Sequence, residues 1–210
     1  MTAAEDALVR IAEDVQQGLQ SDLFRSATNA VPGEGPADAK IMFIGEAPGF
    51  HEDRQGRPFV GAAGQFLDEL LSLAHLKRSD VFITNIVKYR PPNNRDPTPE
   101  EIAACKPYLD QQIAAIDPRV IVTLGRFSMN RWFPGGKITR IHGQPRRVEG
   151  RLIVPMLHPA AALHRPENRP LIEADFRRLP EILAEAERHE TEASSGSDTD
   201  DQEPQQLSLF

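Results

Sequence analysis

The sequence predicts an α/β fold, a three-layer α/β/α sandwich around a four-stranded, mostly parallel sheet. Short apolar runs rich in β-branched residues alternate along the chain with stretches of helical periodicity, which is typical of a parallel sheet covered on both faces. A polar residue or a glycine follows or ends each apolar run. Ligands of such folds bind at the carboxyl ends of the strands, so we expect these residues to meet in one cleft.

The individual elements follow from their apolar patterns. The expected strands are residues 40–47, 81–88, 120–125 and 152–157, the last of them preceded by a hairpin. The expected helices are residues 5–20, 62–76, 100–116 and 171–188, with a short helix beginning in 127–133. Thr98 and Pro99 suit the N-cap and the first position of the third long helix. Residues 31–39 are expected to form turns and residues 158–170 a loop.

Composition indicates one globular domain. The chain has 210 residues, of which 40% are apolar and 26% charged, and this is enough for a sizeable core. No apolar run approaches the roughly 20 residues that span a bilayer, and the acidic N-terminus differs from a signal or transit peptide. We therefore expect a cytoplasmic protein. The single cysteine, Cys105, excludes an internal disulfide and any site that needs several thiolates.

The net charge of −7 is concentrated at the C-terminus. After His189 there are six acidic residues and no Lys or Arg, and the remaining 25 acidic residues stand against 24 basic ones. A near-neutral body can bind DNA where its bases cluster. We predict a folded domain over 1–188, a disordered acidic linker over 189–205, and a separate peptide at 206–210.

The segment GEAPG…GRPFVGAAG, residues 45–64, follows the first strand. Its small residues let the backbone approach a ligand closely, and the aromatic face of Phe59 can stack on a planar ligand. The alternative is a tight strand-to-helix connection in which Phe59 fills the core. The segment matches neither the dinucleotide fingerprint nor the phosphate-binding P-loop.

TNIVKYRPPNNR, residues 84–95, places an amide late in a β-branched strand. The acceptor and donor of Asn85 match the N3–H and O4 of uracil and mismatch cytosine, although Asn85 can also simply cap a turn. Arg90 and Arg95 are candidate phosphate contacts, or else only solubilising residues.

HPAAALHRP, residues 158–166, follows the fourth strand. A neutral His158 can donate an N–H to developing negative charge, or it can be structural. Leu163 beside Arg165 is typical of an apolar wedge next to a phosphate contact, which holds a duplex open once a base has left the stack.

Together these motifs closely resemble family 4 of the uracil-DNA glycosylase superfamily. The resemblance runs from about Leu19 to Leu183 and rests on GEAPG, EDxxGxPFVGxAG, TNIVKxRPPxNR and HPAAAL. It implies four parallel strands between helices, a monomeric chain, and a monofunctional glycosylase of base excision repair. Such an enzyme is a hydrolase that releases uracil from deoxyuridine flipped out of single- or double-stranded DNA.

The resemblance also implies a role for each site residue. Glu46 orients the attacking water and His158 stabilises the departing uracil anion at O2, while Phe59 stacks on uracil and Asn85 reads its edge. Backbone at three small residues walls the pocket: Gly45, Ala47 and Gly49. Glu46 can alternatively order its loop through Arg57 or a backbone N–H.

One departure from the family concerns its cofactor. The family normally carries a 4Fe–4S cluster on four cysteines, and the corresponding positions here are Gly18, Ser21, Tyr89 and Cys105. We therefore expect no cofactor, with Ser21, Tyr89 and neighbouring side chains packing the vacated site.

The last five residues, QLSLF, resemble the peptide that docks bacterial proteins on the DNA polymerase sliding clamp. The residues concerned are Gln206, Leu207, Leu209 and Phe210. A chance apolar terminus is the alternative. With the lost cluster, this peptide also suggests a second class of function, a catalytically weak, replication-associated module that senses damaged bases in the same pocket. Retention of Glu46, Asn85 and His158 favours the enzyme.

Overall fold

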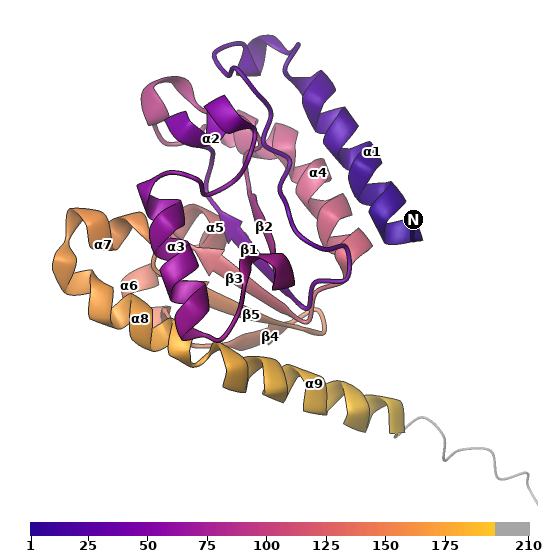
Figure 1. Cartoon of the computed structure of the whole chain (residues 1–210), viewed down its shortest axis with the longest axis vertical. Coiled ribbons are helices and arrows are strands. Elements are labelled where there is room, and N and C mark those ends of the chain that lie inside the picture. Colours follow the sequence, from indigo (N-terminus) through magenta and orange to yellow (C-terminus); the bar gives the residue numbers. More distant parts are fainter. Residues whose placement is uncertain (196–210) are drawn as a thin grey trace, which may run out of the picture.

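The computed structural model describes residues 1–195, and for 189–195 it describes the backbone alone. A five-stranded sheet in the order β2-β1-β3-β5-β4 forms its centre (Figure 1). The four parallel strands are β1 (Ile41–Gly45), β2 (Phe82–Asn85), β3 (Val120–Leu124) and β5 (Arg151–Met156). The α/β class and the four parallel strands are confirmed. The predicted count of four was short by one, because the first arm of the hairpin, β4 (Arg146–Val148), pairs antiparallel with β5 at the edge.

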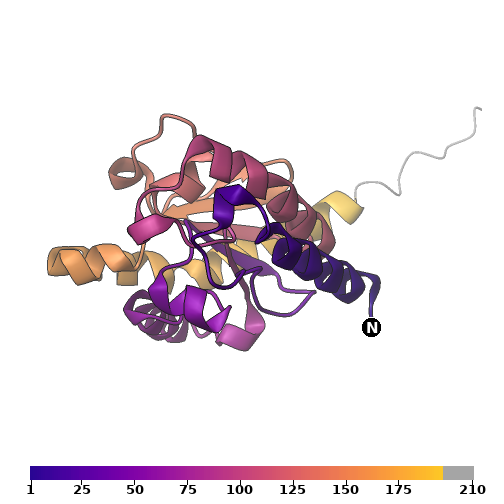
Figure 2. The same cartoon turned by 90° about the horizontal axis from the view of Figure 1, so that it is seen from above.

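Helices cover both faces of the sheet, as Figures 1 and 2 show. One layer holds α1 (Ala3–Gly18) and α4 (Pro99–Ile116), which pack on each other, and the other holds α3 (Ala62–Leu73), α8 (Arg169–Arg177) and α9 (Leu179–Ser195). Side chains of a strand alternate between the two layers. Met42 and Ile44 of β1 therefore belong to the core under α1 and α4, and Ile41 and Phe43 to the other core.

The N-cap of α4 is Thr98, followed by Pro99 at the first position, as the sequence predicts. The Oγ1 atom of Thr98 accepts the N–H of Glu101, and the Glu101 carboxylate accepts the N–H of Thr98 in return. This reciprocal capping box stabilises the first turn of the helix, and it fixes where the chain leaves the loop after β2.

The shorter elements complete the connections. The short helices are α2 (Phe50–Gln55), α5 (Arg126–Asn130), α6 (Ile138–Ile141) and α7 (Ala160–His164), and 3₁₀ turns lie at Asp22–Phe24, Arg78–Asp80, Pro92–Asn94 and Pro166–Asn168. Residues 158–170, predicted as a loop, thus contain a helix and a 3₁₀ turn, and they also include the start of α8.

The predicted helix 171–188 was wrong as a single element. It is divided at Arg178 into α8 and α9, because Pro180 has no N–H to donate within a continuous helix and its ring clashes with the preceding turn. The backbone of α9 also continues to Ser195, beyond the predicted domain end at 188, where glutamate and alanine favour helix. The rest of the predicted linker and the peptide 206–210 lie outside the described residues.

The parallel strands all end at the same edge of the sheet. Gly45, Asn85, Leu124 and Met156 are the last residues of β1, β2, β3 and β5, so the loops that carry the predicted site residues start side by side. Within residues 1–195, no helix is long and apolar enough to cross a membrane.

Candidate active site

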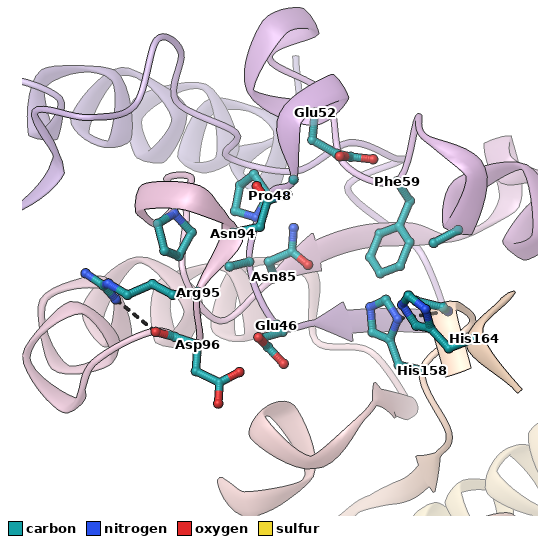
Figure 3. Close-up of a pocket in the computed structure, with 15 residues that line it drawn as sticks. Glu46, Pro48, Glu52, Phe59, Asn85, Asn94, Arg95, Asp96, His158 and His164 are labelled. Atoms are coloured by element: carbon teal, nitrogen blue, oxygen red, sulfur yellow. Dashed lines mark hydrogen bonds between the residues drawn. The ribbon is translucent and has the colours of Figure 1, made fainter. Parts of the chain in front are cut away.

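A pocket of about 590 Å³ opens at the carboxyl ends of the parallel strands. It is lined by side chains from the loops after β1, β2 and β5, which come from widely separated parts of the sequence (Figure 3). The predicted site residues that line it are Glu46, Ala47, Gly49, Phe59, Asn85, Arg95 and His158. The structure thus brings together the residues that the sequence places at separate strand ends.

Asn85 lies at the end of β2, where only 2% of its surface is exposed. Its backbone is in register with Gly45 of β1. A Cβ atom at Gly45 would lie 2.4 Å from Oδ1 of Asn85 and 2.6 Å from Cζ of Phe59. Gly45 is therefore required by close approach, and it makes room for the amide that faces the pocket. Within residues 1–195 the side-chain amide makes no hydrogen bond.

A buried lysine holds this end of β2. The Nζ atom of Lys88 donates to the backbone oxygen of Asn85 at 2.8 Å, to Oγ1 of Thr84 at 2.6 Å and to Oε1 of Gln112 at 2.7 Å. Three acceptors match the three donors of an ammonium group, while burial lowers the pKa of Lys88 to about 7. The contacts tie Asn85 to α4. Sequence reasoning missed Lys88, although a lysine within an apolar run was a signal.

Phe59 is held in a strained conformation. Its φ of 52° is left-handed, which a bulky residue seldom adopts, and the surrounding chain fixes it there. Nη1 of Arg78 donates to the Phe59 carbonyl at 3.1 Å, and a Cβ atom at Gly64 would lie 1.8 Å from that oxygen. Phe59 is 6% exposed and belongs to the core, so the core-filling interpretation holds. It also lines the pocket, and its stacking on a ligand stays a prediction.

Glu52 stabilises the same loop from the other side. Its Oε1 atom accepts the N–H groups of Val60 at 2.9 Å and Gly61 at 2.8 Å. Both donors lie at the start of α3, where free backbone N–H groups favour a carboxylate. Glu52 also lines the pocket, and its signal in the sequence was the acidic pair that precedes the glycine of EDxxGxPFVGxAG.

His158 is a neutral hydrogen-bond donor at neutral pH. Burial lowers its pKa to about 4, although the nearby Glu52 carboxylate acts in the opposite direction. The Nδ1 atom accepts the N–H of Ala160 at 3.1 Å, so in the neutral ring the proton sits on Nε2. The ring lies 5.6 Å from that of Phe59 at an interplanar angle of 26°. The ring of His158 therefore lines the pocket beside the aromatic face, with its one proton on Nε2.

Glu46 is the acidic residue that directly follows β1, and it lines the pocket. Burial raises its pKa, the Asp96 carboxylate raises it further, and the Arg126 guanidinium opposes both. The Glu46 carboxylate makes no hydrogen bond within the described residues, while its backbone carbonyl accepts the N–H of Val87 at 3.0 Å. Arg57, the partner considered from the sequence, binds Glu34 instead, with Nε 2.7 Å from Oε2. The interpretation of Glu46 as a loop-ordering residue through Arg57 was therefore wrong.

Three further polar residues line the pocket that the sequence analysis did not assign. They are Asn94, Asp96 and His164. Asp96 forms an ion pair with Arg126, and both charges act on Glu46. Asn94 lies within RPPNNR and Asp96 follows it directly, so membership of the motif or proximity to it was the available signal.

Residues 32–182 match the family model described as the uracil DNA glycosylase superfamily. The chain belongs to this superfamily. It is 47% identical to a type-4 uracil-DNA glycosylase of Sulfurisphaera tokodaii over 194 residues, which is 88% of each chain. It is 44% identical to a type-4 uracil-DNA glycosylase of Thermotoga maritima over 171 residues, 80% of this chain and 89% of the relative. The resemblance to family 4 is confirmed.

The predicted DNA contacts of this glycosylase-family chain surround the pocket. Leu163 on α7 is 51% exposed, and Arg165 just beyond α7 is exposed as well. Nε of Arg90 donates to Oδ1 of Asn94 at 2.7 Å. Arg95 binds both carboxylate oxygens of Glu101, at 2.9 and 2.8 Å. All four stay predictions as DNA contacts, and the guanidinium of Arg95 is already engaged at the start of α4.

The positions that carry cluster cysteines in this family are occupied differently here. The hydroxyl of Tyr89 donates to the Val15 carbonyl at 2.7 Å, and its ring stacks on Phe24 with a centroid distance of 4.0 Å. A Cβ atom at Gly18 would lie 2.0 Å from the Tyr89 oxygen. These side chains do not fit a four-cysteine cluster, because the phenol occupies the space beside Gly18.

Of the two other positions that carry cluster cysteines in the family, Cys105 is buried and Ser21 is exposed. Cys105 is fully buried, its Sγ atom accepts the N–H of Lys88 at 3.4 Å, and burial raises its pKa to about 11, so it is a protonated thiol. Ser21 is exposed and accepts the N–H of Leu23 at 3.3 Å. The expectation that Ser21 packs the vacated site was wrong, because its hydroxyl caps a surface 3₁₀ turn. Within residues 1–195, no group of three or more His, Cys, Asp or Glu side chains can hold a metal ion.

Proposed function

We infer that the chain is a uracil-DNA glycosylase, which hydrolyses the N-glycosidic bond of flipped-out deoxyuridine and releases uracil in DNA repair. The observation that carries this inference is the buried amide of Asn85. It has no partner within residues 1–195, and it faces a pocket that also holds Phe59 and a neutral His158. The donor and the acceptor of this amide reach the pocket, and a pyrimidine edge supplies a partner for each of them. The type-4 relatives support this reading.

Uracil is recognised by the side-chain amide of Asn85 and by the ring of Phe59. Oδ1 of Asn85 accepts the N3–H of uracil and Nδ2 donates to O4, whereas cytosine presents the opposite pattern. Phe59 stacks on the base. Ala47 and Gly49 line the pocket, and with Gly45 their backbone leaves little room for the 5-methyl group of thymine.

Bond cleavage leaves positive charge on the sugar and negative charge on uracil, and Glu46 and His158 stabilise these charges. The bond between N1 and C1′ breaks, its electron pair leaves with uracil, and the oxygen of a water molecule bonds to C1′. The water releases one proton to solvent and the uracil anion takes one up, so that one water is added across the bond. The Nε2–H of His158 donates to O2 of the departing anion. The Glu46 carboxylate orients the water and stabilises positive charge on the sugar. Neither step requires a metal ion.

Cleavage of a labelled oligonucleotide with one uracil, followed by alkali, tests the proposal. We expect strand scission by the wild type and none above background by Asn85→Ala. Gln17→Ala, which removes an exposed amide on α1, is the control and keeps full activity. A wild type that binds uracil-containing DNA without cleaving single-stranded, U·G or U·A substrates would favour the damage-sensing module instead.

We propose that the enzyme works without an iron–sulfur cluster. The support is the phenol of Tyr89 beside Gly18, and the single cysteine of the chain. Iron and sulfide analysis of aerobically and anaerobically purified protein, with activity measured on the same samples, should give contents near zero and full activity. A stoichiometric cluster in either preparation would refute the proposal.

We also propose that the C-terminal residues QLSLF dock on a DNA polymerase sliding clamp, and that the chain acts as a monomer in the cytoplasm. The peptide, including Leu209 and Phe210, lies outside the described residues, and its sequence alone supports the docking. Pull-down by the clamp should be lost in Leu209→Ala and Phe210→Ala, and equal recovery would contradict docking. Light scattering tests the monomeric state.

A further inference from the structure

An exposed aromatic ring lies next to the pocket and takes no part in the chemistry above. Phe50 is the first residue of α2, and 45% of its surface is exposed. The residue before it, Gly49, lines the pocket. Large exposed apolar side chains on a surface indicate a contact when other features converge on them, and here two arginines do.

The surroundings of Phe50 are basic. The guanidinium carbon of Arg90 lies 5.1 Å from the centre of the Phe50 ring, and that of Arg54 lies 5.7 Å away. Within residues 1–195 neither arginine forms an ion pair. The acids of α2 are engaged elsewhere, since Glu52 binds the start of α3 and Asp53 accepts the N–H groups at residues 28 and 29.

Phe50, Arg54 and Arg90 form a basic aromatic patch, which adjoins the pocket on two sides. Gly49 connects it to the loop after β1, and the hydrogen bond from Arg90 to Asn94 connects it to the loop after β2. Both Gly49 and Asn94 line the pocket. A nucleotide bound in the pocket therefore has its strand neighbour within reach of Phe50. On another side of the pocket, α7 carries the exposed Leu163.

We propose that Phe50, Arg54 and Arg90 form a stacking platform for the base adjacent to the flipped uracil on the same strand. The ring of Phe50 stacks on the face of that base, and the two guanidinium groups bind the flanking phosphates. Aromatic stacking on successive bases, combined with cations along the backbone, is how proteins hold single-stranded nucleic acid. The proposal rests on the proposed uracil-DNA function and adds a second base site to it.

The platform favours single-stranded substrates. In a duplex the neighbouring base is already stacked and paired, so Phe50 can receive it only after further distortion. Alanine substitution of a stacking aromatic side chain weakens binding by about 5- to 150-fold per base. We therefore expect Phe50→Ala to lose affinity by such a factor on single strands and by less on duplexes.

Binding to an oligonucleotide with non-cleavable 2′-fluoro-deoxyuridine tests the platform without requiring catalysis. Anisotropy should show that Phe50→Ala weakens binding when both neighbours are normal nucleotides, and that Phe50→Trp retains it. When the neighbouring base is removed by a tetrahydrofuran abasic residue on the 5′ or the 3′ side, wild type and Phe50→Ala should bind equally in one of the two cases. Leu171→Ala, which removes a side chain 47% exposed on α8, is the matched control and should bind as the wild type does.

Salt dependence separates the arginines from the ring. Arg54→Gln and Arg90→Gln should each reduce the slope of log K against log salt by about 0.7, the value for one phosphate contact on a single strand, while Phe50→Ala leaves the slope unchanged. A loss in Phe50→Ala that is the same with and without each neighbouring base would overturn the platform, as would unchanged binding. Uracil release by the wild type is measured separately, so failure of the platform and failure of the glycosylase activity are distinguishable.

Discussion

Asn85 and Tyr89 are four residues apart in the chain, yet they end in opposite environments. Asn85 presents an amide without a partner in the described residues to the pocket. The hydroxyl of Tyr89 is bonded to Val15, and its ring is stacked on Phe24. A site that binds a ligand leaves polar groups unpaired, whereas a site that only packs satisfies them. The region around Tyr89 is therefore a packed structural region, whereas the pocket is open to a ligand.

Lys88 joins the two regions. Its side chain anchors Asn85 through the backbone carbonyl, while its own N–H binds Cys105 in the former cluster region. Substitutions in the packed region should thus change the free energy of unfolding, and substitutions in the pocket should change catalysis. The following predictions test that division.

Tyr89→Ala should have the largest effect on stability. Removing a fully buried aromatic side chain lowers the free energy of unfolding by about 3–5 kcal/mol, which urea denaturation measures. Where the variant is still folded, its kcat should stay near that of the wild type. Tyr89→Phe, which loses only the hydrogen bond to Val15, should cost about 1 kcal/mol. A kcat that falls more than tenfold in folded Tyr89→Ala would show that the packed region affects catalysis as well as stability, which contradicts the proposed separation.

His158→Ala should have the complementary effect. Loss of one donor to developing negative charge lowers kcat by about 10²–10³-fold, as single-turnover cleavage of a uracil oligonucleotide measures. The free energy of unfolding should change less than it does in Tyr89→Ala, because His158 is only partly buried. A decrease in kcat of less than tenfold would show that His158 is not the donor.

Asp96→Asn should change the pH dependence. In the proposed mechanism Glu46 acts as a carboxylate, so kcat/KM should rise as pH increases through its pKa, which burial and Asp96 raise. Asp96→Asn removes a like charge and releases Arg126 from its ion pair, so the acid limb moves to lower pH. Arg126→Gln should move it to higher pH. Because the pKa of His158 is about 4, protonation of His158 does not produce this limb at higher pH. An acid limb that is the same in both variants would contradict the assignment to Glu46.

Ser21→Ala should have the smallest effect. The exposed hydroxyl caps one turn of a surface 3₁₀ helix, and exposed substitutions of this kind change the free energy of unfolding by about 0.5 kcal/mol or less. Urea denaturation beside Tyr89→Ala gives the comparison. A loss as large as that of Tyr89→Ala would place Ser21 inside the packed region after all.

Most strands and long helices were predictable because their signals are local. Apolar runs and three- or four-residue spacing reflect the faces that strands and helices bury. The division of 171–188 followed from Pro180 and was also local, but the helical periodicity on both sides hid it. The edge strand β4 was less accessible, because its three residues are mostly exposed and only pairing with β5 makes them a strand.

The features of the site also separate into those that could be predicted from the sequence and those that depend on folding. Glu46, Phe59, Asn85 and His158 could be selected from the sequence, because each is an unusual residue type at a strand end or in a glycine-rich loop. The effect of Asp96 on Glu46 could not, since it depends on charges brought together by folding. The same holds for the exposed ring of Phe50 near Arg54 and Arg90, because Arg54 lies on α2 with Phe50 whereas Arg90 comes from the loop after β2.

By itself, the sequence determined the alternating α/β order, the family and the residue types available for chemistry, because these depend on local pattern and on motif spacing. Only the tertiary structure decided which groups are paired and which are free. Tyr89 fills a space beside Gly18 that lies 71 positions earlier, and the amide of Asn85 has room in the pocket because β1 beside it ends in Gly45, which has no Cβ atom. Burial and pairing are properties of neighbours in space, and these two contacts set the difference between a packed region and a binding site.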